Sequence, residues 1–449
     1  MGPQVGLLIF LSTLPPLVLL QPYMIRAETD LFQPTTFLFL NVLLGVTLRA
    51  LLIINERTRA IDDKFLLGQE YAFFFPAILW ITGALVLFLI GYALNFRVPK
   101  NRIGILKGGI EKWANNKILI LSIIILAIAL YSIYDFVSQL NVADLQVTNF
   151  SKKRTFRIDG EKVSLGYQRW GASLANVGFY MIFIFMLLKR VRYFSVHGLF
   201  LFAFFGISAL FALFTGSRVD LLFFFLNGML IFNYLRKFRI RKFLPLILIL
   251  GFLVVFMSRS RHTRTDDIDD LVGGISFYET FGSLVDNRNH LGFTKTAHIM
   301  DAVPGKMNFA YGSTMLGWLY APIPKTYWPE KPIVLTGPLI TENVYQRDWK
   351  RNGGVPPGLV ADLYWNFGYL GIVLGYLIAG VFTRYMYNFF LTVKRNPNAL
   401  FLYMTLLYSL VFVLHSNGVV YAITNLLQGI VPTILIIGFF SLPKIKWFG

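Results

Sequence analysis

Residues 311–371 read YGSTMLGWLYAPIPKTYWPEKPIVLTGPLITENVYQRDWKRNGGVPPGLVADLYWNFGYLG. Most other segments are apolar runs long enough to cross a bilayer, whereas this stretch is rich in proline, glycine, tryptophan, tyrosine and charge. Proline removes a backbone donor and interrupts helices, and irregular backbone beside a membrane needs protein or water to satisfy its polar groups. We therefore predict a structured loop folded over the mouth of a membrane bundle.

The composition of the remaining chain indicates a polytopic membrane protein. Of its 449 residues 56 % are hydrophobic, and the mean hydropathy is +0.60. The absence of cysteine excludes disulfides, thiol chemistry and thiolate metal sites. The net charge of +19 does not indicate nucleic acid, because much of the basic excess lies in short loops between apolar runs. The first apolar run, from Val5, is expected to be a retained membrane segment, since no basic region or cleavage site accompanies it.

The apolar runs predict an all-α polytopic membrane protein with about eleven transmembrane helices, within a range of roughly ten to twelve. Basic clusters in residues 97–117, 189–192 and 236–242 mark inner loops and fix the register between them. The expected division is an N-terminal bundle of about eight spans (1–257), one large structured loop on the outer face (258–358) and about three further spans (359–449). Basic residues at 152–157 then lie outside, either as a solvated loop or facing an anionic ligand.

Three parts of the opening stretch also carry a resemblance. They are Ile323-Pro324-Lys325 with Trp328-Pro329-Glu330-Lys331-Pro332, then Gly353-Gly354 with Pro356, then Asp362 followed by LYWNFGYLG up to Gly371. The pattern resembles the bacterial oligosaccharide repeat-unit polymerases, the O-antigen polymerases of Wzy type. The close similarity covers about sixty residues, and the hydropathy layout extends it loosely over the whole chain. It implies a class of enzyme and not its substrate sugars.

The resemblance implies a membrane glycosyltransferase that joins oligosaccharide repeat units carried on undecaprenyl (polyprenyl) pyrophosphate. The reaction would occur on the periplasmic face of the bacterial inner membrane and build the O-antigen of lipopolysaccharide, or a similar surface polysaccharide. The implied partners are the lipid-linked repeat unit, the growing glycan and membrane lipid, and a chain-length regulator protein stays open as a further partner. No cofactor and no metal are implied, because arginine forks onto phosphate oxygens and stays charged.

Deprotonating the acceptor hydroxyl requires a carboxylate or a histidine. Asp362 lies one turn into the run that begins at Val360, where a carboxylate is costly without a partner, and we predict it to be the general base or an acceptor-orienting group. The alternative is a helix N-terminal charge that complements the helix dipole. His290 and His262 are further acid/base candidates, and His415, in a tight turn between the last two runs, is an alternative base.

Cations expected on the outer side are candidates for binding the pyrophosphate. Arg218 lies in a Thr-Gly-Ser-Arg turn whose backbone N–H groups could add to an anion nest, and such a turn is common in the family resembled. Its alternative is contact with a lipid headgroup. The full pyrophosphate set is Arg218, Arg259, Arg261, Arg264 and Lys331.

Residues expected to bind the glycan are aromatic or cationic, because aromatic faces stack on pyranose rings. They are Arg288, Trp328, Tyr364, Arg347 and Arg351. For Trp328 the alternative is a place in the aromatic belt at the membrane interface.

Two further features stay open. Arg49, inside the second apolar run, is either functional or an arginine near a helix end that reaches the interface. The acidic run Asp266-Asp267-Ile268-Asp269-Asp270 could offer oxygen ligands to Mg²⁺, Mn²⁺ or Ca²⁺, but we expect a solvated helix start.

Other classes of protein also fit the layout. They are a lipid-linked oligosaccharide flippase or transporter, an O-antigen ligase-like transferase, and a catalytically silent assembly subunit. Transporters usually show internal repeats and paired broken helices, whereas this chain concentrates its polar residues in one outer loop, which favours an outer-face enzyme.

Overall fold

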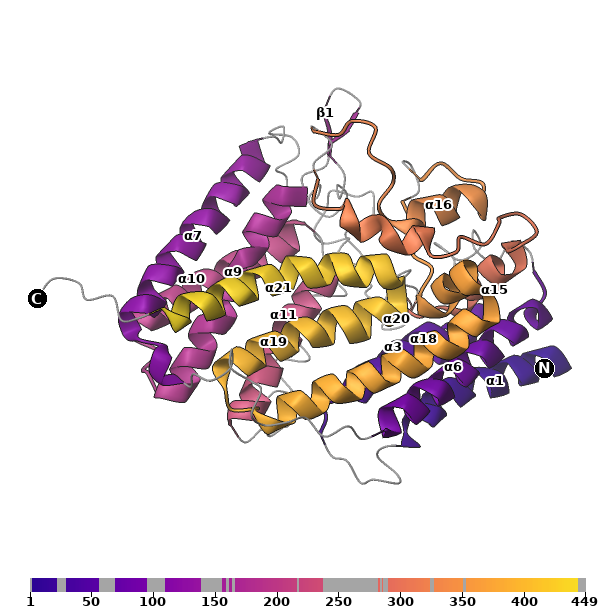
Figure 1. Cartoon of the computed structure of the whole chain (residues 1–449), viewed down its shortest axis with the longest axis horizontal. Coiled ribbons are helices and arrows are strands. Elements are labelled where there is room, and N and C mark those ends of the chain that lie inside the picture. The colour runs from indigo at the N-terminus through magenta and orange to yellow at the C-terminus, as the bar shows by residue number, and fades with distance from the viewer. Residues whose placement is uncertain are drawn as a thin grey trace, which may run out of the picture. The chain divides into compact units, whose positions relative to one another are not determined.

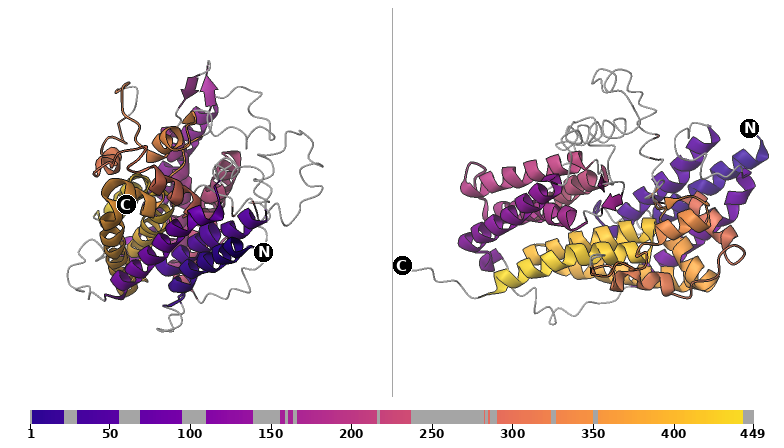
Figure 2. Two further views of the ribbon diagram at one scale, coloured as in Figure 1. Left: turned by 90° about the vertical axis from the view of Figure 1, so that its right-hand side faces the viewer. Right: turned by 90° about the horizontal axis from the view of Figure 1, so that it is seen from above.

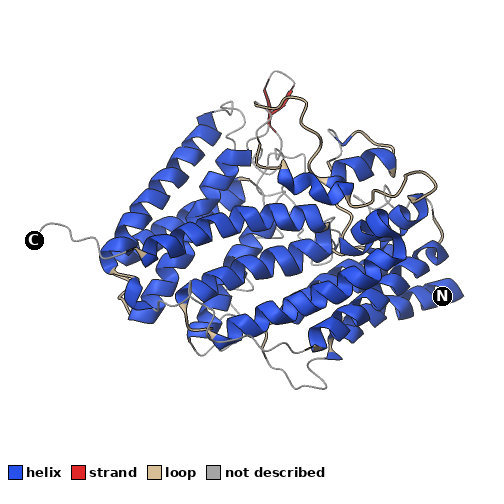
Figure 3. Ribbon diagram, in the orientation of Figure 1, coloured by secondary structure: helices blue, strands red, loops and turns tan. Residues whose placement is uncertain are grey.

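The computed structural model is almost entirely helical (Figures 1 and 3). Two short strands, β1 (Phe156–Ile158) and β2 (Glu161–Val163), pair antiparallel as one hairpin. The expected helical class is confirmed. The structure describes residues 2–21, 30–55, 69–94, 110–138, 156–158, 161–163, 166–215, 218–236, 282, 285, 290–323, 327–349 and 353–442.

Seven helices in these ranges are long and apolar enough to cross a membrane, which indicates a multi-pass membrane protein. They are Pro34–Ile54, Tyr71–Ala93, Asn115–Ser138, Gly166–Lys189, Leu359–Thr392, Pro397–Asn417 and Val419–Ser441. Three shorter apolar helices are Pro3–Leu19, Val196–Ala212 and Asp220–Leu235. The predicted run at 243–257 lies outside the described residues.

The helices form two compact units, and each draws on distant parts of the chain. The first comprises Met1–Val98, Phe281–Phe389 and Thr405–Leu427, and the second comprises Pro99–Thr280, Phe390–Met404 and Gln428–Gly449.

The first unit contains the stretch quoted at the outset. Its helix α1 packs along α6 and η1, and α15 packs against α6. The second apolar run forms one span whose middle, η1, is a π-helix, a widened turn that is frequent at functional sites. The elements are α1 (Pro3–Leu19), α3 (Pro34–Val42), η1 (Leu43–Leu48), α4 (Arg49–Ile54), η2 (Tyr71–Phe74), α6 (Phe75–Ala93), α15 (Phe293–Ala302), η7 (Ser313–Leu319), α16 (Thr336–Asn343), most of α18 (Leu359–Thr392), η8 (Tyr408–Val413), α20 (Leu414–Asn417) and the start of α21 (Val419–Ser441).

Glycines allow α6 and α18 to cross in backbone contact. A Cβ at Gly91 would collide with the main-chain oxygen of Leu377, and one at Gly380 would collide with that of Phe88. Small residues at a crossing are the usual means by which membrane helices pack closely. Close backbone packing therefore helps to hold the long helix that carries Asp362 against α6, and the guanidinium of Arg384 lies 5.0 Å from the ring centroid of Tyr92 across the same pair of helices.

We expect Gly91→Val to destabilise the first unit by about 3 kcal/mol or more, because its methyl groups would meet backbone that cannot turn aside. The measurement is the thermal unfolding midpoint of the detergent-purified protein. Gly83→Val on the same helix is the control, because nothing lies within 4 Å of a Cβ built there. Equal midpoints for the two variants would contradict the close crossing.

The second unit is built around α9, which packs against its neighbours α7, α10 and α11 (Figure 2). Phe179 of α9 and Phe224 of α11 lie with ring centroids 4.8 Å apart in its core. At one end Trp113 Nε1 donates to Asn398 Oδ1 at 3.1 Å. The elements are η5 (Ile110–Lys112), α7 (Asn115–Ser138), the hairpin strands, α9 (Gly166–Lys189), α10 (Val196–Phe214), α11 (Arg218–Leu235), most of α19 (Pro397–Leu407) and the rest of α21.

Candidate functional site

Asn366 joins the loop that precedes η7 to the head of α18. Its Oδ1 accepts from the backbone N–H of Gly312 at 2.9 Å and from Thr314 Oγ1 at 3.0 Å. The carbonyl of the preceding residue, Trp365, accepts from the backbone N–H of Ala310 at 3.0 Å. The polar side chain of the Asn-Phe-Gly motif thus fixes the loop before η7 onto the helix.

The two glycines of the same motif allow α18 to bend. Gly368 has φ 62° and ψ −153°, which interrupts the helix in a conformation that L side chains rarely adopt. A Cβ at Gly371 would lie 2.6 Å from the carbonyl oxygen of Leu363. The bend separates a short first segment, which carries Asp362, from the long segment that follows.

Asp362 is 1 % exposed, and its carboxylate faces the start of α21. Its Oδ2 accepts from the backbone N–H of Val419 at 2.7 Å, while Asn366 Nδ2 lies 3.4 Å from Oδ1. Gly418, with φ 98°, lets the chain turn there, and a Cβ on it would lie 2.6 Å from Oδ2. A carboxylate at this place complements the dipole of α21. The carboxylate thus does lie at a helix N-terminus, as the alternative interpretation expected. The helix is α21, however, and not the one that carries Asp362.

Lys295 of α15 binds the same turn from another side. Its Nζ donates to the carbonyl of Ser416 at 2.8 Å, and its side chain is buried. Burial, and after it the charge of Arg49, hold the pKa of Lys295 well below its usual range. Arg49 and Lys295 therefore act on each other inside the first unit, and Lys295 lies beside the turn that Asp362 holds.

Arg49 begins α4 directly after the π-helix η1 and is only 5 % exposed. An arginine that reaches the membrane interface from a helix end would keep its head group accessible. Its burial inside protein favours the functional interpretation over that alternative.

His290 lies beside the π-helix η1. It is buried, and a Cβ at Gly45, one turn before Arg49, would lie 2.9 Å from His290 Cβ. The next residue, Leu291, donates its backbone N–H to Asn41 Oδ1 at 2.8 Å. We call Arg49, His290, Lys295, Asp362 and His415 the buried polar cluster.

His415 is fully buried in α20 and contacts aromatic rings. Its ring lies with centroids 5.4 Å from Phe88 and 5.4 Å from Tyr376, both edge-on. Neither ring nitrogen has a hydrogen-bond partner among the described residues. Asp362 and His415 are both buried, so burial does not separate them, and His415 stays an alternative base.

Trp328 and Lys331 lie in the proline-rich loop between η7 and α16. Trp328 is 39 % exposed, with its ring 6.1 Å from that of Tyr320. The ammonium of Lys331 donates to the carbonyls of Ala321 at 2.9 Å and Ile323 at 2.7 Å. Lys331 thus closes this part of the loop, while Trp328 offers an accessible ring face.

Tyr364 is buried, and its hydroxyl donates to the carbonyl of Val303 at 3.3 Å. Arg347 is half-buried and follows α16. Arg218 is the first residue of α11 in the second unit, and its side chain is not described. The remaining predicted site residues, together with the acidic run 266–270, lie outside the described residues: Arg259, Arg261, His262, Arg264, Arg288 and Arg351.

Within the described ranges no group of three or more His, Asp or Glu side chains is placed to hold a metal ion. Sequence reasoning did not single out Lys295, because a lone lysine in a short polar helix usually faces water. Its Nζ donates to Ser416, which is distant in sequence, so the sequence alone does not reveal its burial.

The stability of the protein should depend on pH through Lys295. Because its folded-state pKa lies below that of an unfolded lysine, the unfolded chain binds more protons between the two values. Stability should therefore rise as pH increases through this window towards about 10.4, the ordinary pKa of lysine. Thermal midpoints of wild type and Lys295→Met, measured at about pH 7 and about pH 10, check this: wild type should gain relative to the variant at high pH. A difference that does not change with pH would contradict it.

Three comparisons with known proteins complete the description of the site. A scan against models of protein families, a search of curated proteins and a search of solved structures found no match. Function is therefore inferred from the residues and geometry of this chain.

Proposed function

We propose that the chain is a polymerase of surface polysaccharide that joins oligosaccharide repeat units carried on polyprenyl pyrophosphate. The sequence pattern of residues 323–371 supports this class. The buried polar cluster is the observation that carries the proposal. In it Lys295 and Asp362 hold one turn, at Ser416 and Val419, and Arg49 acts on Lys295.

The proposed topology has about eleven spans and one large outer loop. Seven long and three shorter apolar helices support it, and the run at 243–257 supplies the remaining span. α18 begins at the cluster and ends just before Lys394 and Arg395. Basic residues favour the inner side of a membrane, so the end of α18 near Lys394 and Arg395 is proposed to lie inside. The other end of α18, with the cluster, is then proposed to lie on the outer, periplasmic side of an inner membrane.

The proposed reaction is a single displacement at the anomeric carbon. The acceptor hydroxyl oxygen forms the new glycosidic bond, and the bond from that carbon to the pyrophosphate oxygen breaks. The electron pair leaves with the lipid pyrophosphate, and the base takes the hydroxyl proton. Arg49 and Lys295 are proposed to stabilise the departing pyrophosphate, because cations placed where charge develops lower the barrier. The bound anion itself favours the protonated form of Lys295, since a nearby opposite charge raises the pKa of a lysine.

Asp362 is the proposed base or acceptor-orienting group. The backbone N–H of Val419 and the amide of Asn366 fix the direction of its carboxylate. Since the side chain is 1 % exposed, the acceptor can reach it only after the protein around it rearranges. Trp328 is proposed to stack on a sugar of the glycan.

The test is a gel of surface polysaccharide from cells that lack the gene. A ladder reduced to a core carrying a single repeat unit would support the polymerase, because export and ligation persist while polymerisation is lost. Restoration of the ladder by the wild-type gene is the control.

Two other outcomes would overturn the proposal in favour of another class. Loss of every capped species, with lipid-linked repeats held on the inner face, would indicate a flippase. Polymer that is made on its lipid carrier but never attached would indicate a ligase.

A further inference from the structure

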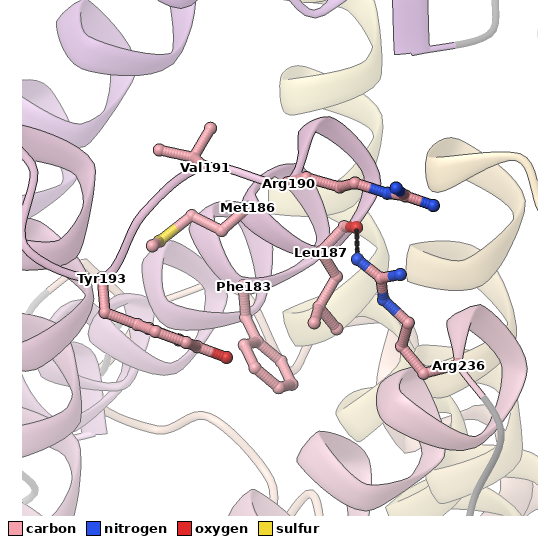
Figure 4. Close-up of a pocket in the computed structure, with 7 residues that line it drawn as sticks. All are labelled: Phe183, Met186, Leu187, Arg190, Val191, Tyr193 and Arg236. Atoms are coloured by element: carbon pink, nitrogen blue, oxygen red, sulfur yellow. Dashed lines mark hydrogen bonds between the residues drawn. The ribbon is translucent and has the colours of Figure 1, made fainter.

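A cavity of about 310 Å³ lies in the second unit, where α9 and α11 end (Figure 4). Figure 4 shows the guanidinium groups of Arg190 and Arg236 together on one side of it, and the side chains of Met186 and Tyr193 on the other. The full lining is Phe183, Met186, Leu187, Arg190, Val191, Tyr193 and Arg236. None of these residues carries a negative charge.

Both arginines are placed by the way the helices terminate. Arg190 follows α9 with φ 57°, and the next backbone N–H, of Val191, donates to the carbonyl of Met186 at 3.1 Å. Arg236 follows α11 and donates one guanidinium N–H to the carbonyl of Leu187 at 2.9 Å. A guanidinium has five N–H donors, so this bond fixes Arg236 and still leaves donors for a ligand.

The surroundings of the cavity are apolar and accessible. Phe194, in the turn between α9 and α10, is fully exposed, and Tyr193 is 54 % exposed. Exposed aromatic residues at the end of a spanning helix are typical of the membrane interface. The cavity therefore combines two arginine side chains with an apolar wall at a helix end of the kind that lies at a membrane interface.

We propose that this cavity binds the phosphate of an anionic phospholipid, with the lipid's upper acyl chain against Phe183 and Met186. Basic pockets between membrane helices suit anionic headgroups, and guanidinium binds phosphate oxygens in a forked geometry. A zwitterionic lipid fits less well, because its own cation would meet the arginines. The site belongs to the second unit and does not depend on the proposed polymerase activity.

The experiment titrates the detergent-purified full chain with phosphatidylglycerol and with phosphatidylcholine and measures binding by native mass spectrometry. We expect phosphatidylglycerol to bind at least about tenfold more tightly. Arg190→Gln and Arg236→Gln should each weaken its binding by about five- to tenfold. Lys189→Gln is the matched control, because Lys189 is an exposed neighbour that does not line the cavity.

Arg236→Gln could also loosen the end of α9, so the unfolding midpoint of each variant is measured beside its affinity. Arg190→Gln keeps the test decisive, since Arg190 is exposed and its turn is fixed by backbone bonds. Equal affinity for the two lipids, or unchanged affinity in Arg190→Gln, would overturn the proposal. Displacement of phosphatidylglycerol by about 1 mM inorganic phosphate would contradict the proposal that the bound phosphate belongs to a lipid, and it would assign the site to a free anion.

Discussion

Asp362→Asn is expected to reduce polymer formation by a factor of about 10² or more, because a general base contributes at least that much. An asparagine oxygen can still accept from the backbone N–H of Val419, so the junction between α20 and α21 should persist. The change therefore removes the charge and basicity of the side chain while it keeps the hydrogen bond. The measurement is the surface polysaccharide ladder, with the amount of protein in the membrane determined in parallel.

Asp362→Ala separates the two roles of the residue. It loses both the charge and the hydrogen bond, so it should lower the amount of folded protein as well as the polymer. Full-length polymer from Asp362→Asn at a normal protein level would limit the role of Asp362 to capping the N-terminus of α21. It would also remove the carboxylate from the proposed mechanism.

Hydropathy predicts the helices of this chain well, because a span must bury about 20 residues in lipid whatever it packs against. The second apolar run is described as one span, although its middle is a π-helix that the sequence does not reveal. The sequence shows the Asn-Phe-Gly-x-x-Gly motif but not why these residues are needed. The structure gives the reason, because Asn366 accepts a hydrogen bond from Gly312 and Gly368 adopts a positive φ.

The site could be predicted only in part, because it depends on pairs of residues that are far apart in sequence. The sequence predicts Asp362 at the start of its helix. It does not predict the hydrogen bond to Val419, because that bond joins α18 to α21 and hydrophobic periodicity describes each helix by itself. Lys331 is predicted to bind pyrophosphate, which stays a prediction, and the structure adds that its ammonium donates to two carbonyls of its own loop. A lysine carries the same charge in either role, so the sequence does not reveal these loop contacts.

Arg49→Gln should reduce polymer formation by about 10² or more, because removing one group that stabilises developing charge has an effect of this size. Arg49→Lys should recover part of the activity, since an ammonium keeps the charge and loses the forked geometry. Lys306→Gln is the control. That lysine is 63 % exposed and pairs with Asp301 at 3.7 Å on the surface, where such pairs contribute little.

A second measurement distinguishes the proposed role of Arg49 from a purely structural one. The charge of Arg49 helps to lower the pKa of Lys295, so Arg49→Gln should move that pKa back towards its ordinary value. The rise of stability with pH that Lys295 causes should then become smaller in the variant. Loss of polymer together with this smaller slope, in a protein that still folds, would support Arg49 and Lys295 as the coupled pair that the proposed site requires. Loss of polymer with an unchanged slope would contradict their coupling and leave Lys295 outside the site.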